Sequence, residues 1–253
     1  MKEKLYTIPL NDAVNAGDEC PFCFIERSLE QDMLDFALGS CASYMESDVR
    51  ENTDKEGFCR MHFKKMFDYG NTLGNAWILK THYMRTREEL NKQIKNFKPG
   101  KVSFADKIRK KSASDNSLVN WVRERENSCY ICNRNREIYD RYIDTFFILY
   151  DKEEEFRTKI KNSKGFCLTH FADLCEASDL KMSPEKQAAF YEVLFPLMTE
   201  NMDRIQEDVN WMIEKFDYEN KDADWKTSRD AIQRGMQKLK GGHPADAPYK
   251  MPK

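Results

Sequence analysis

A cysteine and histidine motif occurs twice along this chain of 253 residues. In each copy, Cys-x-x-Cys is followed at some distance by Gly-Phe-Cys-x-x-His. The motif residues are Cys20, Cys23, Cys59 and His62 in the first copy, and Cys129, Cys132, Cys167 and His170 in the second. Cys20 and Cys129 are 109 positions apart, whereas Cys59 and Cys167 are 108 apart, so the two copies share almost the same register. The sequence therefore predicts a duplicated unit of roughly 90 to 110 residues.

Each copy offers a complete set of metal ligands. Two cysteines separated by two residues can bind one ion, and a cysteine followed three positions later by histidine places both side chains on one face of a helical turn. Three sulfurs and one imidazole suit tetrahedral Zn²⁺. We therefore predict two Zn²⁺ ions per chain, one bound by the four motif residues of each copy. The protein then fills all four coordination positions, which is typical of structural zinc.

Other interpretations of these cysteines remain open. An iron–sulfur cluster is the main competing metal group, because three cysteines and one histidine can also bind such a cluster. A single cysteine is often a small buried residue, although repetition of the whole set favours ligands. A thioredoxin-type redox pair needs a βαβ setting, which this sequence does not predict. Four residues have no metal spacing, and we expect the two cysteines among them in the core: Cys41, Cys175, His82 and His243.

The long separation between the two halves of each motif predicts that the ion joins two distant helical segments. A helix should begin near the Gly-Phe-Cys turn. If the ligand pairs lie at helix N-termini, the helix dipole and the free N–H groups would stabilise thiolate charge. Gly57 and Gly165 precede the third cysteine of each copy by two residues. We predict that both adopt a positive φ. The phenylalanines that follow them, Phe58 and Phe166, should pack beside the sites together with Phe63 and Phe171.

Composition and periodicity predict an all-α fold. Gly and Pro together number 18, and Val only seven, which disfavours turn-rich β structure. Apolar residues recur at helical spacing from Phe22 to Phe36, and Ser183 followed by Pro184 reads as a helix N-terminus. We predict buried stripes on two further helices: Ala76, Leu79, Tyr83, Thr86 and Leu90 on one, and Phe190, Leu194, Leu197, Asn201, Ile205, Val209, Met212 and Phe216 on the other. The prediction is two tandem helical repeats in a bundle-like assembly, each held by its own Cys3His site.

The same patterns divide the sequence into four parts. Residues 1–93 form the first helical repeat, 94–115 a basic connector, 116–220 the second repeat, and 221–253 a C-terminal helix and tail. The connector region is basic because residues 92–111 contain eight Lys or Arg and one Asp. Residues 200–224 are acidic, with nine Asp or Glu against three Lys or Arg. Both runs are typical of solvated surface, and the connector alone suggests contact with nucleic acid.

Charge and hydropathy bound the setting of the protein. The formal net charge is −2, which excludes a globally basic nucleic-acid-binding protein. Residues 1–19 are charged and lack the apolar stretch of a secretory signal, and no apolar run approaches the length of a membrane span. We therefore expect a soluble cytoplasmic protein without membrane contact, in which the cysteines stay reduced.

No motif for catalysis is evident, since His-Glu-x-x-His, Gly-x-x-x-x-Gly-Lys-Ser/Thr and Gly-x-Gly-x-x-Gly are all missing from the sequence. We therefore predict a zinc-binding helical protein that serves as a protein-interaction or regulatory scaffold, and an enzymatic role is the less favoured reading. One alternative is a redox or metal sensor, in which oxidation of Cys59 or Cys167 releases zinc. The other is nucleic-acid binding through the basic connector.

The paired motifs resemble those of a bacterial family of unknown function. In that family Cys-Pro-x-Cys is followed by Gly-Phe-Cys-x-x-His, and the whole unit appears twice. The resemblance covers roughly residues 5 to 220, and the chain departs from the pattern at Tyr130, which stands where the first copy has Pro21. This departure leaves the ligands intact. The resemblance implies no activity, because none is assigned to the family.

Overall fold

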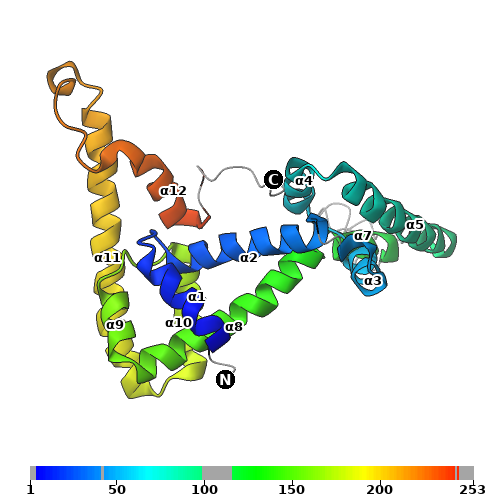
Figure 1. The fold of residues 1–253 in the computed structure, drawn as a ribbon, viewed down its shortest axis with the longest axis horizontal. Helices are drawn as coiled ribbons and strands as arrows, with labels where there is room; N and C mark the ends of the chain where they lie inside the picture. The colour runs from blue at the N-terminus through cyan, green and yellow to red at the C-terminus, as the bar shows by residue number, and fades with distance from the viewer. Residues whose placement is uncertain (1–3, 41–42, 99–115, 243, 245–253) are drawn as a thin grey trace, which may run out of the picture. The chain divides into compact units, whose positions relative to one another are not determined.

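The protein is helical throughout the part that the structure describes, and no strand occurs in that part (Figure 1). The computed structural model describes residues 4–40, 43–98, 116–242 and 244. The predicted all-α class is therefore confirmed. None of the helices described combines the length and the apolar character that crossing a bilayer requires.

The described residues divide into two compact units that are interleaved in sequence. The terminal unit contains the residues up to Leu29 and those from Glu137 onward, and the central unit contains those of Glu30–Arg136. The predicted parts, 1–93, 94–115, 116–220 and 221–253, are consecutive stretches and do not coincide with these units. They remain a prediction about the repeat, and connector residues 99–115 lie outside the described residues.

The unit boundaries fall inside two long helices, α2 and α8. The terminal unit contains α1 (Lys4–Asn15), the start of α2 (Pro21–Leu38), the end of α8 (Tyr130–Lys152), α9 (Glu154–Lys161), α10 (Leu168–Lys181), α11 (Pro184–Glu214), η2 (Tyr218–Asn220), η3 (Ser228–Asp230) and α12 (Ala231–Lys240). The central unit contains the end of α2, η1 (Ser43–Met45), α3 (Ser47–Glu56), α4 (Arg60–Tyr69), α5 (Thr72–Asn96), α7 (Ser117–Glu126) and the start of α8.

Each of these two helices leaves the unit in which it begins because it is apolar at both ends. On α2, Phe22 is buried in the core of the terminal unit, whereas Leu34 and Leu38 are buried in that of the central unit. On α8 the order is reversed, since Ile131 lies in the central core and Phe146 in the terminal core. Burial of both ends therefore exchanges helix segments between the two sequence repeats.

An aromatic cluster forms the centre of the terminal core. The ring of Phe146 lies 5.7 Å from that of Phe22, 5.6 Å from Phe156, 6.0 Å from Phe166 and 6.3 Å from Phe190, measured between centroids. All five rings are at most 1% exposed. Such offset and edge-to-face contacts stabilise the core beyond the burial of area alone.

The two predicted buried stripes fare differently. On α11, Ser183 is the N-cap, as predicted, and Phe190 is buried, but Phe216 lies beyond the helix end and is 81% exposed. On α5 the stripe is wrong, because Ile78 is buried while Tyr83 is 70% exposed. Apolar residues occur on both sides of α5, so periodicity alone did not select the correct face.

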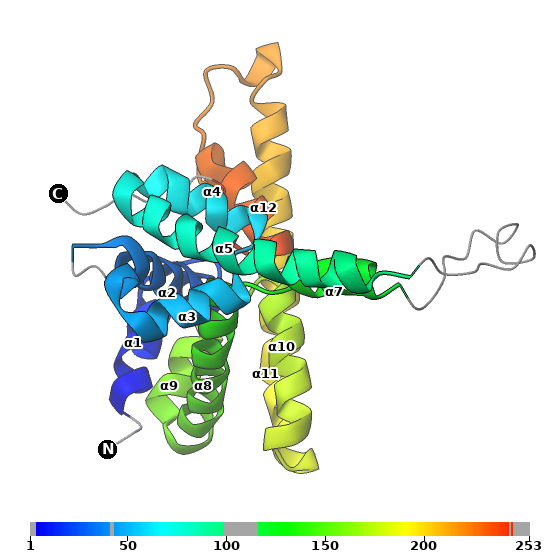
Figure 2. The same ribbon diagram turned by 90° about the vertical axis from the view of Figure 1, so that its right-hand side faces the viewer.

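Helix α12 has an inverted burial pattern. It lies beside α11 (Figure 2). Its polar residues Arg234, Gln237 and Lys238 are buried in the terminal unit. Its apolar side chains are exposed instead, at 44% for Ile232, 53% for Met236 and 52% for Leu239. The spacing of these three residues places them on one helix face. An exposed apolar stripe of this kind is unusual for a surface helix.

Candidate metal centres

The structure gathers all eight predicted ligands into two groups of four. In each group, one ligand atom from every residue lies within 4.8 Å of the others. The first group, which we call the buried centre, consists of Cys20, Cys23, Cys167 and His170. The second group, the open centre, consists of Cys59, His62, Cys129 and Cys132. Two Cys3His groups are present, as predicted.

The predicted division of the ligands between the two sites is wrong. The prediction grouped Cys20 and Cys23 with Cys59 and His62, and it grouped the four ligands of the second copy with one another. Each centre instead combines Cys-x-x-Cys from one copy with Cys-x-x-His from the other. The physical reason is that α2 starts in the terminal unit beside α10, and α8 starts in the central unit beside α4.

Every ligand pair stands at a helix N-terminus, the position at which the helix dipole stabilises thiolate charge. Cys20 immediately precedes α2 and Cys129 immediately precedes α8, while Cys59 and Cys167 are the N-cap residues of α4 and α10. Each centre therefore receives the positive ends of two helix dipoles. Together with free backbone N–H groups, these favour thiolate over thiol at both centres.

The glycines before the third cysteines have the predicted positive φ. Gly57 has a φ of 65° and Gly165 a φ of 74°. A Cβ at position 57 would lie 2.9 Å from Cε1 of His82, whereas one at position 165 would lie 3.4 Å from Sδ of Met198. Both backbone turns thus favour glycine. An added Cβ would lie closer to its nearest neighbour at position 57 than at position 165.

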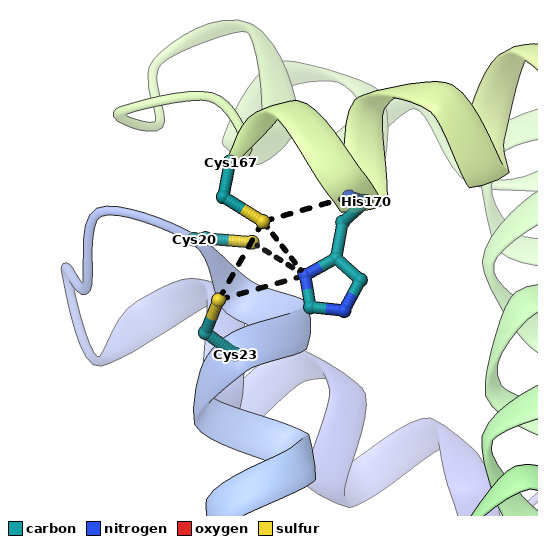
Figure 3. Close-up of side chains that lie close together, drawn as sticks. All are labelled: Cys20, Cys23, Cys167 and His170. Carbon is teal, nitrogen blue, oxygen red and sulfur yellow. Dashed lines mark hydrogen bonds between the residues drawn. The ribbon is translucent and has the colours of Figure 1, made fainter. Parts of the chain in front are cut away.

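The four side chains of the buried centre point toward one another (Figure 3), and the distances between their ligand atoms are those expected around one tetrahedral ion. Nδ1 of His170 lies 3.2 Å from the sulfurs of Cys20 and Cys167 and 3.5 Å from that of Cys23. The sulfurs of Cys23 and Cys167 are 3.7 Å apart. A zinc ion with bonds near ~2.3 Å to sulfur and ~2.0 Å to nitrogen predicts tetrahedral edges of about 3.5 Å for N–S and about 3.8 Å for S–S.

The open centre has nearly the same distances but less cover. Nδ1 of His62 lies 3.2 Å from the sulfur of Cys129 and 3.3 Å from those of Cys59 and Cys132. The sulfurs of Cys59 and Cys132 are 3.9 Å apart. Cys132 is exposed and Cys59 is partly exposed, whereas all four ligands of the buried centre are buried. The two centres thus differ in solvent access rather than in ligand geometry.

A model of a protein family of unknown function (DUF6062) matches residues 1–246. The chain belongs to this family. The resemblance noted in the sequence is thereby confirmed. Neither a curated protein nor a solved structure matches the chain.

Two glutamates contact the ligand histidines of this DUF6062 chain, and the sequence analysis missed both. Nε2 of His170 lies 3.3 Å from the carboxylate of Glu26, and Nε2 of His62 lies 2.9 Å from that of Glu30. A carboxylate at this nitrogen orients the imidazole and leaves Nδ1 free for a metal. The available pattern was the position of Glu26 three residues after Cys23, with Glu30 one helical turn further along α2.

The ionisable groups of each centre perturb one another. Burial opposes protonation of His62, but hydrogen bonds to the Cys129 sulfur and to Glu30 outweigh it and raise the pKa of His62 to about 10. Burial also opposes ionisation of Cys129, yet the contact with His62 and backbone N–H donors lower the pKa of that thiol to about 6. At the open centre of the DUF6062 chain the Cys129 sulfur is therefore a thiolate, the form of cysteine that binds metal, whereas burial and the charge of Cys129 raise the pKa of the neighbouring Cys132 thiol to about 12.

The terminal part of α12 closes the buried centre. A Cβ at Gly241 would lie 3.5 Å from the sulfur of Cys167 and 3.6 Å from that of Cys23, so the backbone covers this pair directly. Nearby, the fully buried Nζ of Lys238 donates to the backbone carbonyls of Glu19, at 2.7 Å, and Lys164, at 2.6 Å. Nζ of Lys238 also lies 3.2 Å from the carboxylate of Glu19, the residue before the ligand Cys20, so a buried ion pair stands next to this centre.

Among the remaining cysteines and histidines, Cys175 and His82 are described by the structure, and they join neither centre. Cys175 is partly buried and packs against the terminal core, while Nδ1 of His82 contacts the carbonyl of Asp54 at 3.1 Å. Cys41 and His243 lie outside the residues that the structure describes. Most of the basic connector does too, so nucleic-acid binding through it stays a prediction.

Proposed function

We propose that this protein binds two structural zinc ions, each of which joins two helices within one of its units, and that it acts as a protein-interaction scaffold. The observation that supports zinc binding best is the agreement between the ligand distances and the edges of a zinc tetrahedron at both centres. Four protein ligands fill such a tetrahedron and leave no position for a substrate or a water. The ions would therefore stabilise the fold rather than perform chemistry.

A single ion fits these centres better than an iron–sulfur cluster. All four ligand atoms of each centre lie within 4.8 Å of one another. A cluster places several iron and sulfide atoms between its cysteines, which requires wider separation of the ligands. Soft thiolates with one imidazole in tetrahedral array are typical of zinc.

Each proposed ion lies at the N-termini of two helices, which explains how it would stabilise the protein. In the buried centre the ion joins the start of α2 to the start of α10, and in the open centre it joins α8 to α4. These helices are far apart in sequence, so the unfolded chain has no preformed site. Binding free energy is then available only to the folded protein and adds to its stability.

The scaffold role is supported by the exposed apolar face of α12. Ile232, Met236 and Leu239 form one stripe, and the helix is anchored through its opposite, polar face. The partner expected there is another protein that presents an apolar surface. A photoreactive amino acid replacing Met236 should cross-link to that partner in cells, and Ile232→Lys should abolish the cross-link. A cross-link that persists in the Ile232→Lys protein would contradict this role.

Metal analysis of the purified protein tests the zinc proposal. Two zinc ions per chain and a colourless solution are expected, together with loss of helical circular dichroism after removal of metal by a strong chelator. The Cys175→Ser protein is the matched control, because this cysteine belongs to neither centre, and it should retain both ions. A stably folded chain without metal, or a coloured chain that contains iron, would contradict the proposal.

A further inference from the structure

The two centres contain equivalent pairs of sulfurs that differ in access. Cys59 and Cys132 of the open centre occupy the same motif positions as Cys167 and Cys23 of the buried centre. The sulfurs of the two pairs are 3.9 Å and 3.7 Å apart, respectively. The molecule therefore provides one pair that small solutes can reach and an almost identical pair that they cannot.

We propose that the open centre is an oxidation site, at which a peroxide joins Cys59 and Cys132 in a disulfide and releases one of the two zinc ions. This inference depends on the proposed zinc binding. The first support is exposure, because Cys132 lies at the surface and Cys59 is only partly covered. Oxidation of cysteine is selective for thiolates that solvent can reach.

The second support is the hydrogen bonding of the two N-cap cysteines. The sulfur of Cys167 accepts a hydrogen bond from the backbone N–H of His170 at 3.5 Å, whereas that of Cys59 accepts none at the N-terminus of α4. A donor to a zinc-bound sulfur withdraws electron density and makes it a weaker nucleophile. Cys59 is thus the more reactive of these two equivalent residues.

The third support is the cover over the buried pair. Gly241, at the end of α12, lies so close to the sulfurs of Cys23 and Cys167 that a Cβ there would be 3.6 Å and 3.5 Å from them, respectively. An oxidant has to displace this backbone before it reaches either sulfur. Exposed Cys132 has no such cover within the described residues.

The reaction balances with hydrogen peroxide as the oxidant. The Cys132 sulfur attacks one peroxide oxygen, an S–O bond forms, the O–O bond breaks, and hydroxide leaves. The Cys59 sulfur then attacks the Cys132 sulfur, which forms the S–S bond and expels a second hydroxide. Two thiolates and one peroxide thus give one disulfide and two hydroxides, with two electrons passing from sulfur to oxygen.

Little movement is needed for this disulfide. The two sulfurs must approach from 3.9 Å to a bond length of about 2.0 Å. The centre then retains two of its four ligands, Cys129 and His62, which is too few to hold zinc firmly. The new bond still joins α4 to α8, so the central unit should keep most of its helicity, and a thiol reductant should restore the site.

The test is exposure of the fully metallated protein to hydrogen peroxide, with released zinc followed by a colorimetric chelator and disulfides mapped by mass spectrometry. We expect one zinc equivalent to leave at least tenfold faster than the other, with a Cys59–Cys132 disulfide, and to rebind after dithiothreitol. Simultaneous release of both ions, or a mapped disulfide that contains Cys20, Cys23 or Cys167, would overturn the proposal. So would a Cys129–Cys132 disulfide as the first product.

Two further variants test whether another thiol reacts first and whether the backbone at Gly241 protects the buried pair. Cys175→Ser should leave both release rates unchanged, since this thiol belongs to neither centre; a slower first release would mean that Cys175 is the reactive thiol and would overturn the proposal. Gly241→Leu should disturb the cover and accelerate release of the second ion only, and acceleration of the first instead would count against the assignment. A purified protein that contains no zinc before peroxide is added would instead refute the proposed function itself, and this inference with it.

Discussion

The buried centre and the open centre use the same four residue types in the same geometry, yet their surroundings differ. Four buried ligands, the end of α12 and the buried Lys238 surround the first centre. The second has an exposed Cys132 and a stronger contact between its histidine and a carboxylate, at 2.9 Å rather than 3.3 Å. Duplication thus provided two equal ligand sets, and the segments packed around them determine what each can do.

The backbone around the two centres differs as well. At the open centre the N–H of Tyr130 donates to the carbonyl of Gly57 at 2.9 Å, which joins the start of α8 to the turn before α4. The corresponding residue at the buried centre is Pro21, which has no N–H and cannot make this bond. The open centre therefore has a backbone link between its two ligand segments that does not depend on metal.

Loss of a ligand should have the largest effect, and the effect should be unequal. Cys20→Ser should lower the free energy of unfolding by about 4 kcal/mol or more, since metal loss is among the few single changes of that size. Cys132→Ser should cost about 1–2 kcal/mol, because solvent can reach the vacated position and the backbone link at Tyr130 persists. Urea unfolding followed by circular dichroism, with zinc content measured in parallel, checks both values.

Equal losses of unfolding free energy in the Cys20→Ser and Cys132→Ser proteins would show that burial does not distinguish the centres. A zinc content near one ion per chain in each variant would confirm that the two centres bind independently. Loss of both ions from either variant would mean that one centre requires the other to form.

The buried charge next to the buried centre should have the second largest effect. Nζ of Lys238 lies 3.2 Å from the Glu19 carboxylate, and both side chains are at most 2% exposed. Burial lowers the pKa of Lys238, and the charge of Glu19 opposes that shift. Lys238→Met would remove the most buried of the cations around this carboxylate, since Arg204, although closer at 2.5 Å, is 35% exposed. The substitution should cost about 3 kcal/mol, because breaking a buried pair is strongly destabilising.

Lys164→Met is the matched control for that variant. Its Nζ also approaches Glu19, at 3.9 Å, but its side chain is 45% exposed. The expected cost is below about 1 kcal/mol, because solvent screens exposed ion pairs. A similar loss of stability in both lysine variants would argue against a special role for the buried cation.

Most of the local chemistry was predictable from the sequence, whereas the partition of ligands was not. Spacing within a few residues fixed the helix N-termini at the cysteines, the positive φ of Gly57 and the N-cap at Ser183. Which Cys-x-x-Cys pair meets which Cys-x-x-His pair depends on where the far ends of α2 and α8 are buried. Leu34, near the end of α2, is buried in the central core, and Phe146, in the second half of α8, is buried in the terminal core; this long-range packing decides the partition, and spacing in sequence does not reveal it.

The glutamates were missed for a related reason. An acidic residue on a helix usually faces solvent, and neither Glu26 nor Glu30 belongs to the repeated motif. Their role becomes visible only when the histidine from a distant helix is placed opposite them. Because each centre takes its Cys-x-x-Cys pair from one copy and its Cys-x-x-His pair from the other, the sequence revealed neither the contacts to the histidines nor the correct ligand partners.

Removing these carboxylates should have the third largest effect. Here the open centre should be affected more than the buried centre, the reverse of the order expected for loss of a ligand. Glu30→Gln should weaken zinc affinity at the open centre by about 10–100-fold, the usual cost of losing a carboxylate that orients a ligand histidine. Glu26→Gln should have a smaller effect at the buried centre, because its contact is longer and its side chain is 50% exposed. Competition with a chelator of known affinity measures both constants, and a larger loss in the Glu26→Gln protein would contradict the role assigned to Glu30.

Substitution of the two glycines should give the smallest difference between the centres. Gly165→Ala places a Cβ at an ordinary contact distance of 3.4 Å from Met198, so the cost should be the left-handed backbone strain of about 1 kcal/mol. Gly57→Ala adds an approach of 2.9 Å to the ring of His82, which contacts the Asp54 carbonyl and cannot move freely. We therefore expect about 2 kcal/mol for Gly57→Ala. If thermal unfolding shows equal losses, His82 yields to the new methyl group, and the tighter turn at the open centre does not contribute to its stability.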